Sequence, residues 1–158
     1  MVNWTEEDLA AYKQKCRIRD RAGQLDSCPP DAKPKRGDEE HQEQVSLMKW
    51  VEYQAPSCPA LYLLFAIPNG GDRNVIVAKK LKAEGVRRGV PDLFLAFPVK
   101  PYSGLFIEMK KKKGGQTSKE QKKWIKGLRE QGYWAEVCAG AAVAQAVIMD
   151  YLEGGIQS

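Results

Sequence analysis

Three side chains whose types and spacing could hydrolyse a phosphodiester are Asp92, Glu108 and Lys110. Glu108 and Lys110 are two residues apart, so a β-strand would place both side chains on the same face. Two carboxylates that share a site attract a divalent cation, and oxygen ligands favour Mg²⁺ or Mn²⁺ over zinc. A lysine beside them can stabilise charge that develops on a phosphate or help to deprotonate a water.

The strands that carry these residues are expected to form an antiparallel hairpin. The sequence predicts strands over 90–97 and 105–110, joined by the turn PVKPYSG. If that turn centres near Lys100, Asp92 lies opposite Glu108. Directly opposed residues have Cβ atoms about 4.5–5.5 Å apart, where two like charges destabilise a sheet. Each residue alone is more often a solvated or turn residue, but together they favour a metal site.

The remaining elements follow from apolar periodicity and from turn residues. A central strand is expected over ALYLLFAI (60–67), and PNGG (68–71) reads as a loop. The other predicted elements are helices from Asp38 to about Gln54, from Asp72 to Glu84, from Ser118 to Gly132 and over 141–152, with a strand over 133–140. This order predicts an α/β fold, a mixed sheet with helices on its faces.

The N-terminal part of the chain differs in character from the rest. A capped helix is expected from Thr5 to about residue 22, and residues 23–37 are rich in Pro, Gly and charge, which is typical of a linker. We therefore expect an appendage over 1–37 and a single domain over 38–158.

Charge favours a polyanionic partner. The chain has a net charge of +5, but residues 1–44 carry a net −2 and residues 45–158 a net +7. A basic main body of this kind suits nucleic acid. No apolar run is long enough to span a membrane, and the polar, acidic start differs from a signal peptide, so an intracellular, cytoplasmic protein is expected.

Zinc is not expected. The four cysteines, at positions 16, 28, 58 and 138, form no CxxC pair, and His41 is the single histidine. In a reducing compartment these cysteines are most simply free thiols.

Two segments carry a family resemblance. GVPD (89–92) followed by IEMK (107–110) resembles the PD-(D/E)xK nuclease signature. IPNGG, LKAEGVRRGVPDLFLAF, GLFIEMK and the SxxQ of Ser118–Gln121 together resemble the VRR-NUC family of virus-type replication-repair nucleases, with the stand-alone phage-like form as the nearest likeness. The resemblance spans about residues 38–152.

The resemblance implies a restriction-endonuclease-like fold, similar to Holliday junction resolvases, with Mg²⁺ or Mn²⁺ as cofactor. Asp92, Glu108 and the backbone carbonyl of Met109 would bind the metal, and Lys110 would position or activate the water. Such families also use a glutamate on the first core helix. Glu40 is the candidate because it shares a helical stripe with Gln44 and Leu47, and Glu43 is its rival.

Gln121 matches the glutamine that follows the family's ExK strand, and it would help to order the metal ligands or the phosphate. Its alternative role is a capping box with Ser118, since Ser-x-x-Gln has that pattern. Gln44 would support the site in a similar way. The residues expected to contact DNA are Asn69, Lys79, Lys80, Lys82, Arg87, Arg88, Lys111, Lys112 and Lys113.

The expected function is a metal-dependent endonuclease that acts on branched DNA, such as Holliday junctions or flaps, in replication, recombination or repair. A homodimer with low sequence specificity is expected, located in the cytoplasm of the bacterial host if a phage encodes it. The alternatives are a DNA-binding module without catalysis and a sequence-specific restriction-type endonuclease. The preferred DNA structure, the metal used in the cell, a helicase partner and the role of residues 1–37 stay open.

Overall fold

The computed structural model describes residues 38–68 and 75–154 of the chain. The predictions for residues 1–37, for Asn69 and for the start of the 72–84 helix lie outside the described residues. The helices and strands are α2 (Asp38–Gln54), the 3₁₀ helix η1 (Pro59–Leu63), β1 (Leu64–Ala66), α3 (Val75–Ala83), β2 (Leu93–Leu95), β3 (Leu105–Lys110), α4 (Lys119–Glu130), β4 (Trp134–Ala139) and α5 (Ala141–Leu152). None of the described helices is long and apolar enough to cross a membrane.

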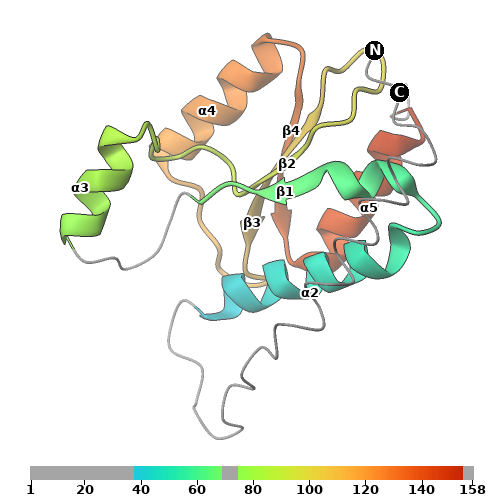
Figure 1. The fold of residues 1–158 in the computed structure, drawn as a ribbon, viewed down its shortest axis with the longest axis horizontal. Coiled ribbons are helices and arrows are strands. Elements are labelled where there is room, and N and C mark those ends of the chain that lie inside the picture. Colours follow the sequence, from blue (N-terminus) through green and yellow to red (C-terminus); the bar gives the residue numbers. More distant parts are fainter. Residues whose placement is uncertain (1–37, 69–74, 155–158) are drawn as a thin grey trace, which may run out of the picture. The chain divides into compact units, whose positions relative to one another are not determined.

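The four strands form one mixed sheet in the order β1-β2-β3-β4. The pairs β1–β2 and β2–β3 are antiparallel, whereas β3 and β4 are parallel. Parallel neighbours need a crossover connection, which α4 supplies. Figure 1 shows α4 on one side of the sheet and α2 and α5 on the other. The predicted α/β fold, with helices flanking a mixed sheet, is confirmed.

The hairpin of β2 and β3 has the predicted register. Leu93 pairs with Ile107 and Leu95 pairs with Leu105, so the pairs are symmetric about residue 100. β3 also has the predicted bounds, Leu105–Lys110. Extending this register by one residue sets Asp92 opposite Glu108, as the sequence predicts.

The hydrophobic core fixes which face of β3 carries chemistry. Leu105, Ile107 and Met109 are fully buried in a core cluster that also contains Leu47 of α2 and Ile148 of α5. Burying one such side chain stabilises the fold by about 1.5–3 kcal/mol. A slip of one residue in the strand pairing would move all three side chains from the core to the opposite face of the sheet. The core therefore strongly specifies the register. The residues of β3 that alternate with these three, Glu108 and Lys110 among them, therefore lie on the other face of the sheet.

The prediction of a central strand over 60–67 is wrong. Pro59 begins a 3₁₀ helix, and only Leu64–Ala66 forms a strand, which lies at the edge of the sheet. Proline has a fixed φ and no N–H to give to a ladder, so it favours the first turn of a helix. The strand is also half-exposed, with 49% of Phe65 accessible. The apolar run therefore divides between two elements.

Tyr151 of α5 joins the last helix to the hairpin turn. Its hydroxyl donates to the carbonyl of Phe97 at 2.6 Å and accepts from the N–H of Val99 at 3.1 Å. The side chain is fully buried. The carbonyl of Phe97 and the N–H of Val99 thus share this one buried hydroxyl as a hydrogen-bond partner.

Candidate active site

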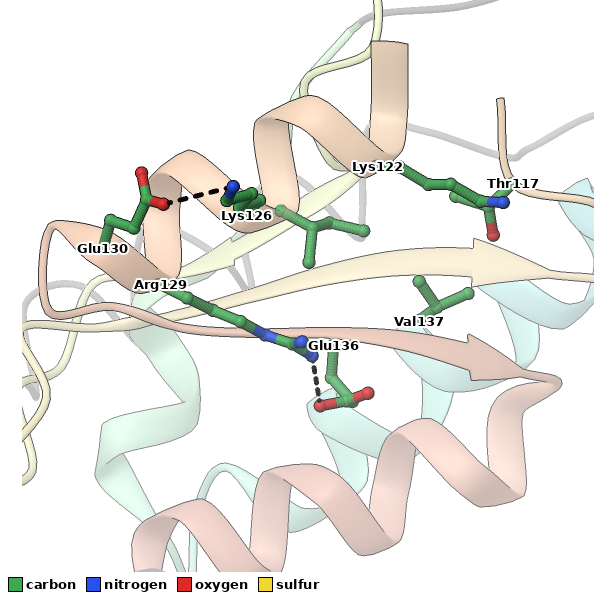
Figure 2. Close-up of a pocket in the computed structure, with 8 residues that line it drawn as sticks. Thr117, Lys122, Lys126, Arg129, Glu130, Glu136 and Val137 are labelled. Carbon is green, nitrogen blue, oxygen red and sulfur yellow. Dashed lines mark hydrogen bonds and ion pairs between the residues drawn. The ribbon is translucent and has the colours of Figure 1, made fainter. Parts of the chain in front are cut away.

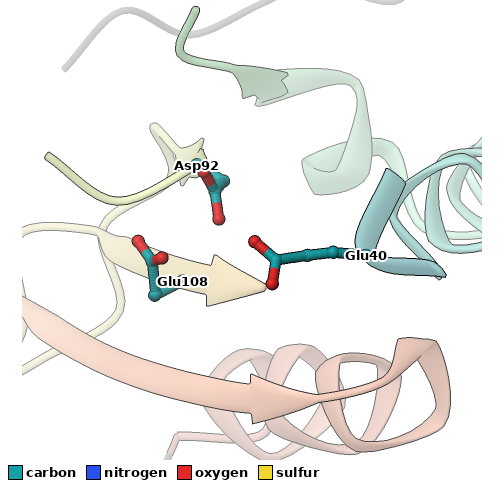
Figure 3. Close-up of side chains that lie close together, drawn as sticks. All are labelled: Glu40, Asp92 and Glu108. Atoms are coloured by element: carbon teal, nitrogen blue, oxygen red, sulfur yellow. The ribbon is translucent and has the colours of Figure 1, made fainter. Parts of the chain in front are cut away.

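Three carboxylates from three separate elements meet at one end of the sheet. Glu40 of α2, Asp92 just before β2 and Glu108 of β3 each offer an oxygen, and these oxygens lie within 4.8 Å of one another. Figure 3 shows the three side chains converging near the end of β3. We call these three residues the acidic cluster.

Lys110 is bonded to two members of the acidic cluster. Its ammonium lies 2.5 Å from Glu108 Oε1 and 3.3 Å from Glu40 Oε1, and it donates to the carbonyl of Met109 at 2.8 Å. Burial lowers the pKa of Lys110, but the carboxylates of Glu108 and Glu40 outweigh burial, and the net shift is upward. The lysine is therefore a charged donor at the cluster.

Glu108 is the most deeply buried carboxylate of the cluster, at 1% exposure. Burial raises its pKa to about 7, against the opposing effect of the Lys110 hydrogen bond. Its Oε1 accepts from Lys110 and from Nε2 of Gln121, whereas its buried Oε2 has no partner among the described residues. An unpartnered, buried carboxylate oxygen costs free energy unless a cation binds it.

Asp92 is held by the strand beside it. Its Oδ2 accepts from the N–H of Met109 at 2.9 Å. Burial raises the pKa of Asp92, and the Met109 hydrogen bond opposes that rise. The aspartate thus has one oxygen fixed to β3.

The acidic cluster fits a hard divalent cation. Its donors are carboxylate oxygens, without histidine or cysteine, which suits Mg²⁺ or Mn²⁺. Oε2 of Glu108, buried and without a partner among the described residues, is a carboxylate oxygen that could serve as a ligand. Burial, and after it the repulsion from neighbouring carboxylates, raises the pKa values of both Asp92 and Glu108, and a bound cation would offset that cost.

The predicted helix glutamates have different surroundings. Glu40 belongs to the acidic cluster. Glu43, one turn further along α2, accepts from the N–H of Ala141 at 2.8 Å and pairs with Lys112 at 3.0 Å. Gln44 lies half-buried on the same helix. The carbonyl of Met109 accepts from Lys110 and is therefore already engaged.

Gln121 makes both of the contacts that were predicted as alternatives. Its Oε1 accepts from the N–H of Ser118, and the Ser118 hydroxyl accepts from the Gln121 N–H, which completes a capping box at the start of α4. The other end of the same amide, Nε2, donates to Glu108. Capping therefore orients this side chain toward the acidic cluster.

Most of the predicted DNA-contacting residues are exposed, and some are paired with carboxylates. Lys80 pairs with Glu84 at 3.9 Å and Lys111 with Glu39 at 4.0 Å. Lys113 is exposed. The other members of the predicted set among the described residues are also exposed, namely Lys79, Lys82, Arg87, Arg88 and Lys112, the last of which pairs with Glu43. Their predicted contact with DNA stays a prediction.

Sequence reasoning missed the contact that seats the loop before Asp92. Gly89 has a φ of +86°, and a Cβ there would lie 2.7 Å from Cβ of Glu120. Nearby, Nε1 of Trp124 donates to the carbonyl of Arg88 at 3.1 Å. The glycine of GVPD was the available signal, since a positive φ or a close approach favours that residue.

A separate cavity of about 650 Å³ lies between α4 and β4. Figure 2 shows two ion pairs there, Lys126 with Glu130 and Arg129 with Glu136. Its lining contains no member of the acidic cluster. The chemistry described above thus lies elsewhere on the domain.

Comparison with known proteins identifies the family. The VRR-NUC domain matches residues 38–142. A solved structure described as a VRR-NUC domain protein is 30% identical, with a TM-score of 0.65, and the match covers 78% of this chain and 93% of that chain. No curated protein matches the chain. With this family match over most of its length, the chain belongs to the VRR-NUC family of nuclease domains.

Proposed function

We propose that this protein is a metal-dependent endonuclease that hydrolyses phosphodiester bonds in branched DNA. The observation that carries the proposal is the acidic cluster itself, three carboxylate oxygens within 4.8 Å of one another beside a charged lysine. Lys110 offsets only one of the three carboxylate charges, and the like charges that remain destabilise the fold unless a cation binds between them.

The residues of the candidate active site would have separate roles. Glu40, Asp92 and Glu108 would hold Mg²⁺ or Mn²⁺, which supplies Lewis acidity and lowers the pKa of water. Lys110 donates from inside the cluster, where its ammonium can orient a water or stabilise charge on the phosphate. Gln121 holds one oxygen of Glu108, which leaves the other oxygen available as a ligand.

The proposed substrate is DNA of branched structure, bound with low sequence specificity. The +7 net charge of residues 45–158 supports a polyphosphate partner. A homodimer is proposed because a symmetric four-way junction presents two scissile strands to a two-fold assembly. The site of action would be the cytoplasm, that of the bacterial host if the protein is phage-encoded.

Cleavage of matched DNA substrates tests the proposal. Duplex, flap and four-way-junction DNA of the same sequence are incubated with Mg²⁺, Mn²⁺ or EDTA and with the wild type or Lys110→Ala. Metal-dependent cutting of the branched substrates, lost in the variant, is expected. Binding without cutting under every metal would instead support a non-catalytic module, and a discrete ladder from plain duplex would support a restriction-type enzyme.

The oligomeric state has its own measurement. Gel filtration with light scattering of the complex with a four-way junction is expected to give the mass of the DNA plus twice the chain mass of 17.7 kDa. A species that holds one copy of the chain on a four-way junction would contradict the homodimer and leave the proposed chemistry intact.

A further inference from the structure

Glu43 connects three elements that carry or flank the acidic cluster. It extends from α2, and its Oε2 accepts from the N–H of Ala141, the first residue of α5, at 2.8 Å. Its Oε1 lies 3.0 Å from Nζ of Lys112, two residues after Lys110. Only 18% of the Glu43 side chain is exposed. One carboxylate thus joins α2 to the end of β3 and to the start of α5.

The start of α5 needs this carboxylate. Gly140 occupies the N-cap position with a φ of 94° and has no side chain to accept from the first N–H groups of the helix. The Ala141 bond lowers the pKa of Glu43, and the Lys112 bond adds to that effect. The helix is therefore capped by a side chain from another helix, which holds a negative charge at the positive end of its dipole.

The capped junction is itself bonded to the candidate active site. The N–H of Gly140 donates to the carbonyl of Lys110 at 2.8 Å. A Cβ at Gly140 would lie 2.7 Å from Cγ of Lys112, so the backbone there packs closely against the Lys112 stem. Movement at this junction would displace the segment that follows β3.

Glu40 depends on the position of α2. Its side chain is 41% exposed, and its contact with Lys110 spans 3.3 Å. The polar bonds of Glu43 lie less than one turn away, whereas Leu47, the first fully buried residue of α2, lies nearly two turns away. Besides the direct bond from Lys110 and the exposed Glu39–Lys111 pair, the bonds of Glu43 are the nearest ones that tie this end of α2 to β3 and α5.

We infer that Glu43 is a positioning residue that holds Glu40 at the cation site by capping α5, and that it is not itself a ligand. The inference rests on the proposed function, because it concerns the same cation. It makes length, rather than charge, the property of Glu43 that matters. A glutamine keeps an oxygen at the same reach for the Ala141 N–H, whereas an aspartate keeps the charge but is one methylene too short.

The test is the affinity for Mn²⁺, measured by calorimetry without DNA. Glu43→Ala and Glu43→Asp are expected to weaken Mn²⁺ binding about 10-fold or more, the usual effect of losing a group that orients a ligand. Glu43→Gln is expected to stay within about 3-fold of the wild type, because the exposed Lys112 ion pair contributes little. A ligand or a purely electrostatic role predicts the reverse order, with Asp better than Gln, and would overturn the inference.

Two controls separate positioning from general effects. Glu39→Ala removes one charge from the same helix, where Glu39 is 65% exposed and 4.0 Å from Lys111, and should leave Mn²⁺ affinity nearly unchanged. Exchange of the Ala141 amide should be slow in the wild type and in Glu43→Gln, and faster in Glu43→Ala. Faster exchange with unchanged Mn²⁺ affinity would reduce Glu43 to a structural cap and refute its positioning role.

The outcome also separates this inference from the proposed function. A wild type that binds no Mn²⁺ would overturn both. A wild type that binds Mn²⁺ and cuts DNA, with Asp better than Gln at position 43, would overturn the positioning role alone. At saturating Mn²⁺ the cleavage rate of Glu43→Asp should recover to near the wild-type rate, since the defect lies in holding the cation.

Discussion

Replacing Glu108 by glutamine should stabilise the metal-free protein at alkaline pH. Glu108 is 1% exposed, and one of its oxygens has no partner among the described residues. Glutamine has nearly the same shape and no charge. In the absence of a cation, Glu108→Gln therefore removes the charge of Glu108 without leaving a cavity, while Lys110 keeps Glu40 and the Met109 carbonyl as partners.

The pKa of Glu108 gives the size of the effect. Burial raises it from 4.5 to about 7 in the folded protein. Between these two values the folded state binds more protons than the unfolded state, so stability falls as pH rises from 4.5 to about 7. A shift of this size corresponds to about 3 kcal/mol. Well below pH 4.5 both states are protonated, and the wild type and the variant should be equally stable.

Urea unfolding in EDTA at about pH 4 and about pH 8 measures this directly. The free energy of unfolding of Glu108→Gln is expected to exceed that of the wild type by about 3 kcal/mol at the higher pH, and to match it within a few tenths of a kcal/mol at the lower pH. Mn²⁺ at about 100 times its Kd should restore about 2.7 kcal/mol to the wild type and much less to the variant. A variant less stable than the wild type at about pH 8 in EDTA would refute the claim that the ionised Glu108 carboxylate destabilises the metal-free protein.

Two further substitutions test the scaffold of the site. Tyr151→Phe removes the hydroxyl that bonds Phe97 and Val99, and should lower the free energy of unfolding by about 1–3 kcal/mol in urea, because two backbone groups lose their buried partner. An unchanged midpoint would show that water replaces the hydroxyl. Ser118→Ala removes the cap of α4 and should cost about 1 kcal/mol in the same assay. The variant keeps the backbone N–H of residue 118, which is the group that binds Gln121 Oε1, so Mn²⁺ affinity should stay close to that of the wild type, and a marked loss would show that Gln121 depends on the Ser118 hydroxyl.

The hairpin could be predicted because its constraints are local. The turn and the alternation of β3 fix a register symmetric about residue 100, and the structure has that register. The same arithmetic places Asp92 beside Glu108 and Lys110 on the face of Glu108. Short-range geometry is enough here, since a strand has a period of two and a slip would expose its core face.

Contacts between distant elements could not be predicted in this way. Glu40 and Glu43 are less than one turn apart, so helical spacing alone leaves both as candidates. The choice between them depends on Ala141, nearly a hundred residues later. The prediction of a central strand over 60–67 was wrong for a related reason, because apolarity alone does not distinguish a strand from a buried helical turn. Pro59 was the local feature that favoured the helical turn, because proline suits the first position of a helix.

The bond from Tyr151 to Phe97 has a consequence for the order of synthesis. The two residues are 54 positions apart, and the residues of the acidic cluster all precede both β4 and Tyr151. A nascent chain that ends after Lys110 would contain every carboxylate of the acidic cluster. It would lack both β4, which pairs in parallel with β3, and the Tyr151 hydroxyl that bonds the turn. The ribosome therefore synthesises the acidic cluster well before the elements that align it. Nuclease competence should begin only once α5 has emerged and docked.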